Sequence, residues 1–301
     1  GMGIYIQKGR YQMEEIFQKK TDEMDCQPGG PFVIQMLFKN PVKLPEKEHM
    51  TDVMQRHIGT TECSCCDDNM VGFTALDHVV ELEEGKRSVQ LFISTCSDFE
   101  EDSIDDFQKN QMWDCKDDRD RIFHECKYQV FATDMLATAL PRQERANLDM
   151  DFLEALVELF PTCEAFYFQN CGKLFLAEDV KNCQFTGLNR FIRFGVNVRF
   201  FHISGSEDIV VDTIGMGTLC LPDFQYYFHD MNPNWVVNHG YNMASYILNQ
   251  ETIIGNGDAI MGILQGTITK DVQWQCYHRK SLINPSRDVI DVNMGRYAAG
   301  N

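Results

Sequence analysis

Phe32-Val-Ile-Gln-Met-Leu-Phe38 is the stretch that decides the fold class, and it is apolar except for Gln35. An apolar run of this length, entered through the turn signal Pro28-Gly-Gly-Pro31, predicts a buried strand. Residues 46–58 have helical spacing, and residues 71–82 and 88–95 are β-rich runs that predict a hairpin. An acidic helix over 100–113 and a strand over 127–132 follow. This order predicts an α+β fold whose N-terminal part is ferredoxin-like in element order.

The rest of the chain continues this mixture and predicts mixed or antiparallel sheets with packed helices. A strong helix is expected from Arg145 to Phe160, with Asp149 in its first turns, where the helix dipole favours an acid. A second helix should begin with Asn232 as N-cap and Pro233 as its first residue. Further strands are expected over 163–168, 173–176, 195–203, 208–212, 224–228, 259–264, 272–278 and 289–292.

The sequence predicts three parts. Residues 1–30 form a lead-in with a short helix near Met13 to Phe17. Residues 31–185 form the ferredoxin-like half, and residues 186–301 form a β-rich half with one long helix, because the character of the chain changes near 185.

The net charge of −18 over 301 residues argues against binding to nucleic acid or anionic lipid. No run of eighteen apolar residues is present, which predicts no membrane span, and the first residues lack the apolar core of a signal peptide. We therefore expect a cytoplasmic protein whose twelve cysteines are reduced thiols, most of them in the core.

The C-terminal third carries a resemblance. Val211-Asp-Thr-Ile-Gly215, Leu221-Pro-Asp-Phe-Gln-Tyr226 and Ser281-Leu-Ile-Asn-Pro-Ser-Arg287 followed by Asp291 are its clearest residues. From Val196 to Val292 the chain resembles an uncharacterised bacterial family, the domain of unknown function 4261. The resemblance implies a bacterial cytoplasmic protein, and it supplies no activity.

Cys63-Ser-Cys-Cys66 is the sharpest chemical feature of the sequence. Together with His57 it suggests a zinc site made of His57, Cys63, Cys65 and Cys66. No second Cys-x-x-Cys pair completes a set, and Asp67-Asp68 disfavours a redox pair. We expect a solvent-facing loop of ordinary thiols and no cofactor, with zinc as the alternative.

The cationic side chains of the C-terminal third are the other candidates. His278, Arg279 and Arg287 converge in sequence, and His229 precedes the positive end of the helix at Asn232. They predict a binding site for an anionic ligand. His239 shares the apolar side of that helix, which predicts a buried, hydrogen-bonded core residue.

Two functions remain open. The first is a non-enzymatic module that binds another protein in interaction or regulation, since no catalytic motif is found and strand edges are available for pairing. The alternative is an enzyme or small-ligand-binding protein that uses the anionic-ligand site.

Overall fold

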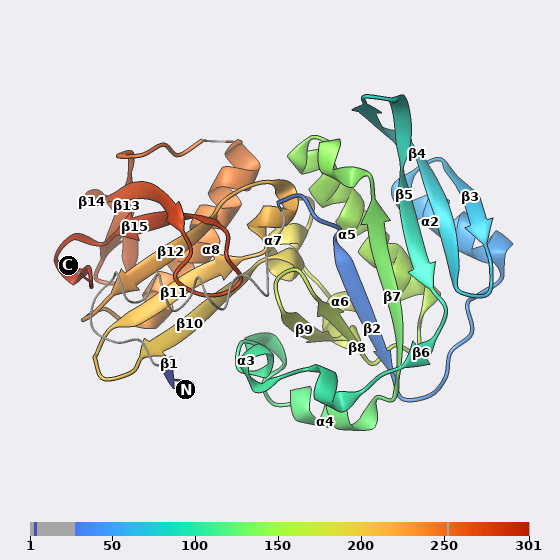
Figure 1. The fold of residues 1–301 in the computed structure, drawn as a ribbon, viewed down its shortest axis with the longest axis horizontal. Coiled ribbons are helices and arrows are strands. Elements are labelled where there is room, and N and C mark those ends of the chain that lie inside the picture. The colour runs from blue at the N-terminus through green and yellow to red at the C-terminus, as the bar shows by residue number, and fades with distance from the viewer. Residues whose placement is uncertain (1–2, 5–27, 252, 301) are drawn as a thin grey trace. The chain divides into compact units, whose positions relative to one another are not determined.

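The computed structural model describes residues 3–4, 28–251 and 253–300. The chain divides into two compact units, residues 31–195 and residues 196–301 with the first thirty. Each unit has its own sheet and helices, which confirms the α+β class (Figure 1). The helix expected near Met13 to Phe17 lies outside the described residues. No helix of the described ranges has the length and apolarity needed to cross a membrane.

The division between the units differs in position from the expected one. It lies between Gly195 and Val196, so residues 186–195 group with the first unit. The described parts of the first thirty residues group with the second unit. Gly29 donates its backbone N–H to the Gly217 carbonyl at 2.8 Å, and a two-residue strand at Gly3–Ile4 pairs with residues 202–203.

The unit of residues 31–195 is built on an antiparallel sheet in the order β3-β4-β5-β7-β2-β8-β9, with β6 beside β7. Its strands are β2 (Val33–Phe38), β3 (Thr61–Cys66), β4 (Met70–Leu82), β5 (Gly85–Ser94), β6 (Ser97–Asp98), β7 (Tyr128–Met135), β8 (Ala165–Phe168) and β9 (Lys173–Leu176). Its helices are α2 (Lys47–Ile58), η1 (Glu101–Ser103), α3 (Asp106–Lys109), η2 (Trp113–Cys115), α4 (Arg119–Glu125), η3 (Ala137–Ala139), α5 (Arg142–Leu159), α6 (Ala177–Lys181) and α7 (Asn189–Gly195). Strands β3 and β4 extend the central order β5-β7-β2-β8 at one edge, and β9 extends it at the other. The ferredoxin-like element order stays a prediction.

Strand β2 is buried on both sides, as its sequence predicts. Alternate residues of a strand point to opposite faces of the sheet. Met36 and Phe38 point to the face that carries α2 and α5, which contact each other, and the ring of Phe38 lies 6.0 Å from that of Phe160, just after α5. Gln35 and Leu37 point to the opposite face.

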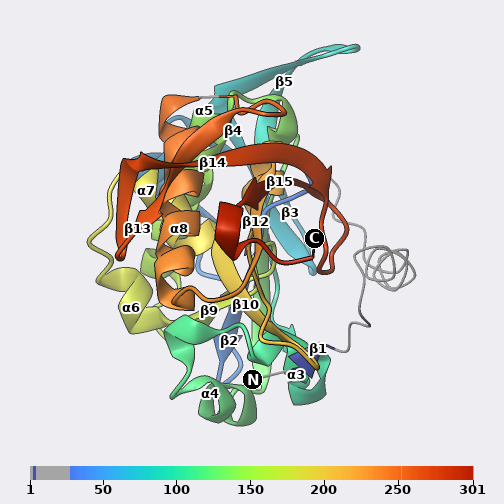
Figure 2. The same cartoon turned by 90° about the vertical axis from the view of Figure 1, so that its left-hand side faces the viewer.

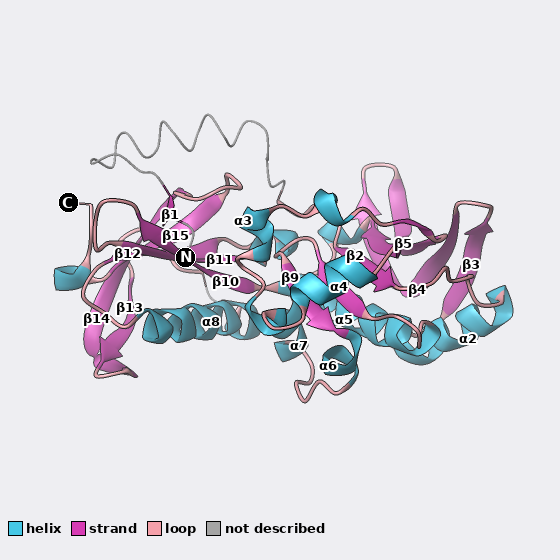
Figure 3. Ribbon diagram, turned by 90° about the horizontal axis from the view of Figure 1, so that it is seen from below, coloured by secondary structure: helices cyan, strands magenta, loops and turns pink. Residues whose placement is uncertain are grey.

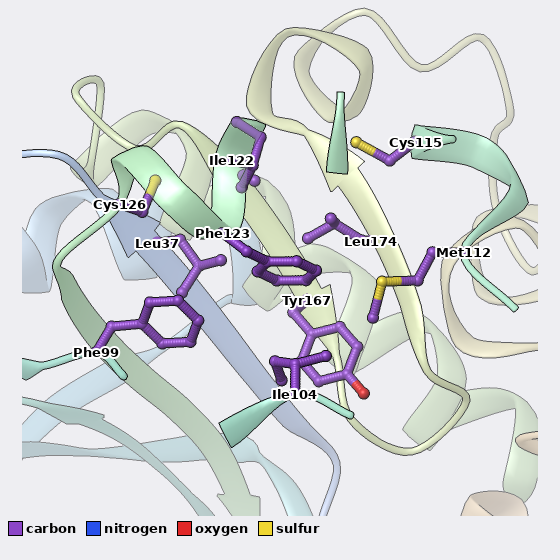
Figure 4. Close-up of a cluster of buried hydrophobic side chains, with 11 residues drawn as sticks. Leu37, Phe99, Ile104, Met112, Cys115, Ile122, Phe123, Cys126, Tyr167 and Leu174 are labelled. Carbon is purple, nitrogen blue, oxygen red and sulfur yellow. The ribbon is translucent and has the colours of Figure 1, made fainter. Parts of the chain in front are cut away.

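The opposite face is partly covered by the segment from β6 to α4. Phe99, Ile104, Met112 and Phe123 of this segment join Tyr167 of β8 in one buried apolar cluster (Figure 4). The single acidic helix expected over 100–113 is wrong: the segment forms η1, α3 and η2 in succession. Asp105 starts α3 with a capping box, and the chain must bend so that its scattered apolar residues reach the cluster.

The second unit contains a mixed sheet in the order β1-β10-β11-β12-β15-β14-β13, in which β1/β10 and β12/β15 are parallel. Its elements are β1 (Gly3–Ile4), β10 (Asn197–Ile203), β11 (Ile209–Ile214), η4 (Met216–Leu219), β12 (Asp223–Phe228), α8 (Pro233–Gln250), β13 (Ala259–Leu264), β14 (Thr267–Lys280), β15 (Asp288–Asn293) and η5 (Gly295–Tyr297). Helix α8 runs along one face of β10–β12 (Figure 3). Asn232 caps it by accepting the N–H of Asn234, which confirms the predicted start.

Candidate functional site

A network of buried charged side chains joins β10, β11 and β12. Arg199 donates from Nε and Nη2 to the two carboxylate oxygens of Asp212 at 2.8 and 2.7 Å. Arg287 donates from Nη2 to Asp212 at 2.9 Å and from Nε to Asp223 at 2.8 Å. Thr213 donates its hydroxyl to the other oxygen of Asp223 at 3.0 Å. Because buried charges are tolerated only when paired and hydrogen-bonded, this network is a condition of the fold.

Arg287 is fully occupied within the network. Besides the two carboxylates, its guanidinium donates to the carbonyls of Thr213, Ile283 and Pro285 at 2.8, 3.1 and 2.9 Å. A guanidinium has five N–H groups, and these bonds use all five. Burial opposes ionisation of Asp212, but Arg199 and Arg287 outweigh it and hold the pKa of that carboxyl below its ordinary value. Arg287 therefore fastens the loop 281–287 to the sheet.

A cavity of about 560 Å³ adjoins this network. Cys220 and Pro222 line it from the segment before β12, and His278 and Arg279 line it from the end of β14. Arg287 contributes to the wall as well, so the structure brings together three of the four residues predicted for an anionic ligand. The fourth, His229, is not among the lining residues. Its ring Nδ1 lies 2.9 Å from the Asp230 carboxylate, and its backbone N–H donates to the backbone carbonyl of Tyr297.

The cations of this cavity already have partners. Arg279 forms an ion pair with Asp291 at 3.1 Å, and the exposed Lys280 forms one with Asp288 at 2.7 Å. His278 donates from Nε2 to the carbonyl of Ile254 at 2.5 Å. An acidic ligand must therefore compete with carboxylates of the protein itself. The ligand-binding role of these residues stays a prediction.

The solvent side of α8 is a feature that the sequence reasoning missed. None of the eighteen residues of α8 is Asp, Glu, Lys or Arg, whereas seven of the eighteen residues of α5 are. Apart from Asn234 and Gln250 near its ends, its exposed positions recur every three or four residues. They form one stripe, which we call the α8 face: Trp235, Asn238, Asn242, Tyr246 and Asn249. Trp235 and Tyr246 are 37% and 49% exposed. Both the absence of charge and the apolar side of the helix were visible in the sequence, but no significance was given to the uncharged solvent side.

The turn between β13 and β14 borders the α8 face. A Cβ added to Gly266 of this turn would lie 3.0 Å from the Trp235 ring, so the turn lies directly against that side chain. Leu264, at the end of β13, is 51% exposed. Figure 2 shows α8 beside β13. The uncharged surface therefore extends from the helix to the end of a sheet-edge strand.

Residues 212–293 match the family model of a Domain of unknown function (DUF4261). This confirms the resemblance expected from the sequence over these residues, and the description carries no activity. Comparisons with curated proteins and with solved structures returned no match. The range matched by DUF4261 contains Asp212, Asp223 and Arg287 of the buried network, as well as the whole of α8.

His239 connects α8 to the sheet within the DUF4261 range. It is fully buried, and its Nε2 donates to the carbonyl of Met261 at 2.7 Å. The Nδ1 atom lies 2.5 Å from the hydroxyl of Tyr226 and accepts from it, because a neutral imidazole has one donor and one acceptor. Burial lowers the pKa of His239, and the bond to Met261 opposes the shift only in part. The predicted core role of His239 is confirmed.

The thiols predicted to lie in a loop belong to strand β3, so that prediction is wrong. Cys63 and Cys65 pair with Phe73 and Gly72 of β4, and a Cβ on Gly72 would lie 2.7 Å from the Cys65 sulfur. The strand forms because β4 offers it a pairing edge and a glycine over which a thiol fits. This pairing could not be read from the local sequence.

The proposed zinc ligands are not gathered around one point. His57 lies 2.7 Å from Glu158 through Nε2, while Cys63, Cys65 and Cys66 follow one another along β3. Over the described ranges, no three His, Cys, Asp or Glu side chains are grouped as for a metal ion. These residues do not fit a four-ligand site in this arrangement, and elemental analysis of the purified protein tests the zinc prediction.

Proposed function

We propose that this protein is a non-enzymatic protein-interaction module and that the α8 face is its binding surface. The observation that carries the proposal is an exposed helix stripe without a single charge in a chain of net charge −18. The centres of protein interfaces are depleted in charged residues and enriched in Trp, Tyr and Met. Trp235 and Tyr246 supply such anchors, and Leu264 extends the apolar area.

The partner that fits this surface best is a second copy of the chain. A two-fold contact places the same surface on both sides, so a charged surface would set like charges opposite each other. The α8 face avoids this penalty. Its amide side chains each carry donors and an acceptor, which makes them complementary to copies of themselves. The net charge of −18 disfavours self-contact through acidic parts of the surface.

The alternative function, binding of an anionic small ligand beside Arg287, has weaker support. All five N–H groups of Arg287 are engaged, and Arg279 and Lys280 already pair with carboxylates. Among the described residues that line the cavity, the cationic side chains all have such partners, so none favours the alternative.

Sedimentation equilibrium tests the proposal, with Asn242→Glu as the decisive variant. Asn242 lies in the middle of the α8 face and is exposed. The substitution sets two carboxylates near each other in a two-fold contact, and we expect the dimer dissociation constant to rise by about tenfold or more. Gln273→Glu is the matched control. Gln273 is exposed on β14, and the next residue, Trp274, packs against His239 of α8. Gln273 therefore points to the sheet face turned away from α8.

Two results would refute self-association through this face. One is a wild-type protein that stays monomeric at about 100 μM, well above the range of a functional dimer. The other is an equal effect of Asn242→Glu and Gln273→Glu. Thermal unfolding of all three proteins establishes that the variants keep their fold.

A further inference from the structure

A second cavity lies in the unit of residues 31–195, on the sheet face turned away from α5. Phe131 of β7, Gln35 of β2 and Tyr167 of β8 are direct neighbours across three strands, so they share this face. The apolar cluster covers one part of the face, and the remaining part is an open cavity of about 430 Å³. That volume lies within the usual range of ligand pockets.

A chain of three glutamine amides crosses the floor of this cavity. Gln169 donates to the side-chain oxygen of Gln35 at 3.1 Å, and Gln35 donates to that of Gln129 at 2.8 Å. Gln129 donates from its side-chain amide nitrogen to the hydroxyl of Ser97 and to the backbone carbonyl of Asp98. Gln35 is only 4% exposed, so the chain is part of the folded structure. The amide oxygen at its open end, on Gln169, accepts no hydrogen bond from the described residues.

Tyr167 joins the apolar cluster to the cavity. Its ring packs beside Ile104 and Phe123 and its hydroxyl points out of the cluster (Figure 4). The hydroxyl accepts a long bond of 3.4 Å from Gln108, and nothing in the described part of the chain accepts its proton. Tyr167 as a whole residue is only 4% exposed, and it lines the cavity. The cavity is therefore the direction from which a hydrogen-bond acceptor would have to come.

The lining of the cavity is acidic. Asp98 and Glu100 contribute carboxylates, and no Lys, Arg or His belongs to the lining. Neither carboxylate has an ion-pair partner within the described ranges. The site therefore offers carboxylates for a cation, an unused amide oxygen for an N–H donor and a hydroxyl for a carbonyl.

We propose that this cavity binds a peptide segment through one basic residue. A Lys or Arg side chain meets the carboxylates of Asp98 and Glu100. The backbone amide of the same residue supplies the N–H for Gln169 and the carbonyl for Tyr167. Glutamine side chains are amides like the peptide group itself, and their donors and acceptors match it in chemistry. The site is separate from the α8 face, so either proposal can fail alone.

Side-chain amide signals of the glutamines give a direct readout by nuclear magnetic resonance. The probe is acetyl-Gly-Lys-Gly-amide, titrated into the 301-residue protein labelled with ¹⁵N. We expect saturable shifts of the Gln35 and Gln169 side-chain amides. Tyr167→Phe removes one hydrogen bond and keeps the ring, and Asp98→Asn removes one exposed carboxylate. Each should weaken binding by about fivefold or more.

Matched controls separate this site from general attraction to an acidic protein. Asp68→Asn removes an exposed carboxylate from the β3–β4 turn and should leave the affinity unchanged within about twofold. The same peptide with norleucine in place of lysine lacks the charge, and butylammonium lacks the peptide groups; both should bind more weakly.

Three outcomes would overturn the proposal. They are the absence of saturable shifts, butylammonium binding as tightly as the peptide, and Asp98→Asn behaving like Asp68→Asn. Because Asp98 is exposed, its variant tests the site even if Tyr167→Phe fails to fold.

Discussion

Arg287 shows how a single residue can look like a ligand contact and act as a support of the fold. Its neighbours in sequence, His278 and Arg279, line the same cavity. Its partners Asp212 and Asp223 come from strands more than sixty positions earlier. A buried guanidinium with five occupied donors has none left for a ligand, so its substitution should act on stability first.

Arg287→Lys should lower the free energy of unfolding by about 3 kcal/mol or more, because an ammonium group cannot reach five acceptors and leaves a buried carboxylate unpaired. Arg279→Lys is the comparison: the Arg279 side chain is 42% exposed, and we expect a change below about 1 kcal/mol. Denaturant unfolding measures both. Equal stability of Arg287→Lys and wild type would show that the network is dispensable.

The role of an individual residue could be predicted from the sequence where it depends only on the spacing of nearby residues. His239 was predicted to be buried because it shares the apolar side of α8, and the cap at Asn232 follows from Asn-Pro. The partners of Arg279 and Arg287 could not be predicted, because strand pairing at long range brings them close. The same holds for Cys65, whose strand depends on β4.

At the scale of elements, helix α5 begins three residues earlier than the predicted start at Arg145. The helix begins at Arg142, directly after Pro141, so Asp149 lies two turns inside and is fully buried. Arg145 donates to Asp134 in two bonds of 3.0 Å, while its Nε stays 3.6 Å from Asp149. No described group hydrogen-bonds the Asp149 carboxylate. Burial first, and then Asp134, raises the pKa of Asp149 well above its ordinary value.

This raised pKa makes the stability of the protein depend on pH. As pH rises above the ordinary aspartate pKa, the unfolded chain loses its proton and the folded protein keeps it, so folding loses stability up to the folded pKa. Asp149→Asn removes this loss. Its advantage over wild type should grow from pH 4 towards neutral pH by up to about 1.4 kcal/mol per pH unit. Unfolding at several pH values measures it, with the exposed Asp117→Asn as control; a pH-independent difference would contradict the assignment.

Helices and strands were predictable where the apolar period was long, as in β2 and α8. The segment from β6 to α4 was not predictable. It is rich in acidic residues, and the few apolar residues that determine its conformation show no regular period. Phe99, Ile104 and Met112 are buried in one cluster although their spacing fits no single helix. Of the first cavity the sequence indicated only His278, Arg279 and Arg287 of its lining. The second could not be foreseen, since its lining comes from several strands and from the segment after β6.

At the scale of the whole molecule, the charge of −18 acts on both proposed contacts, in opposite directions. Like-charged copies repel each other over long range, whereas a basic peptide is attracted. Raising the salt concentration from 0.1 M to 1 M shortens the screening length from about 10 Å to about 3 Å. We expect the dimer to become tighter and the peptide complex weaker, each by about threefold or more. Sedimentation and resonance titrations measure the two constants, and a parallel change of both would contradict this assignment.

The pairing of Arg199 with Asp212 crosses the start of the matched range, since Arg199 lies in β10 and the match begins at Asp212. A truncated chain that started at residue 212 would lose the first partner of that carboxylate and expose β11 as a new edge open to aggregation. The matched range thus omits a strand that pairs with β11. Any fragment prepared for expression should retain β10.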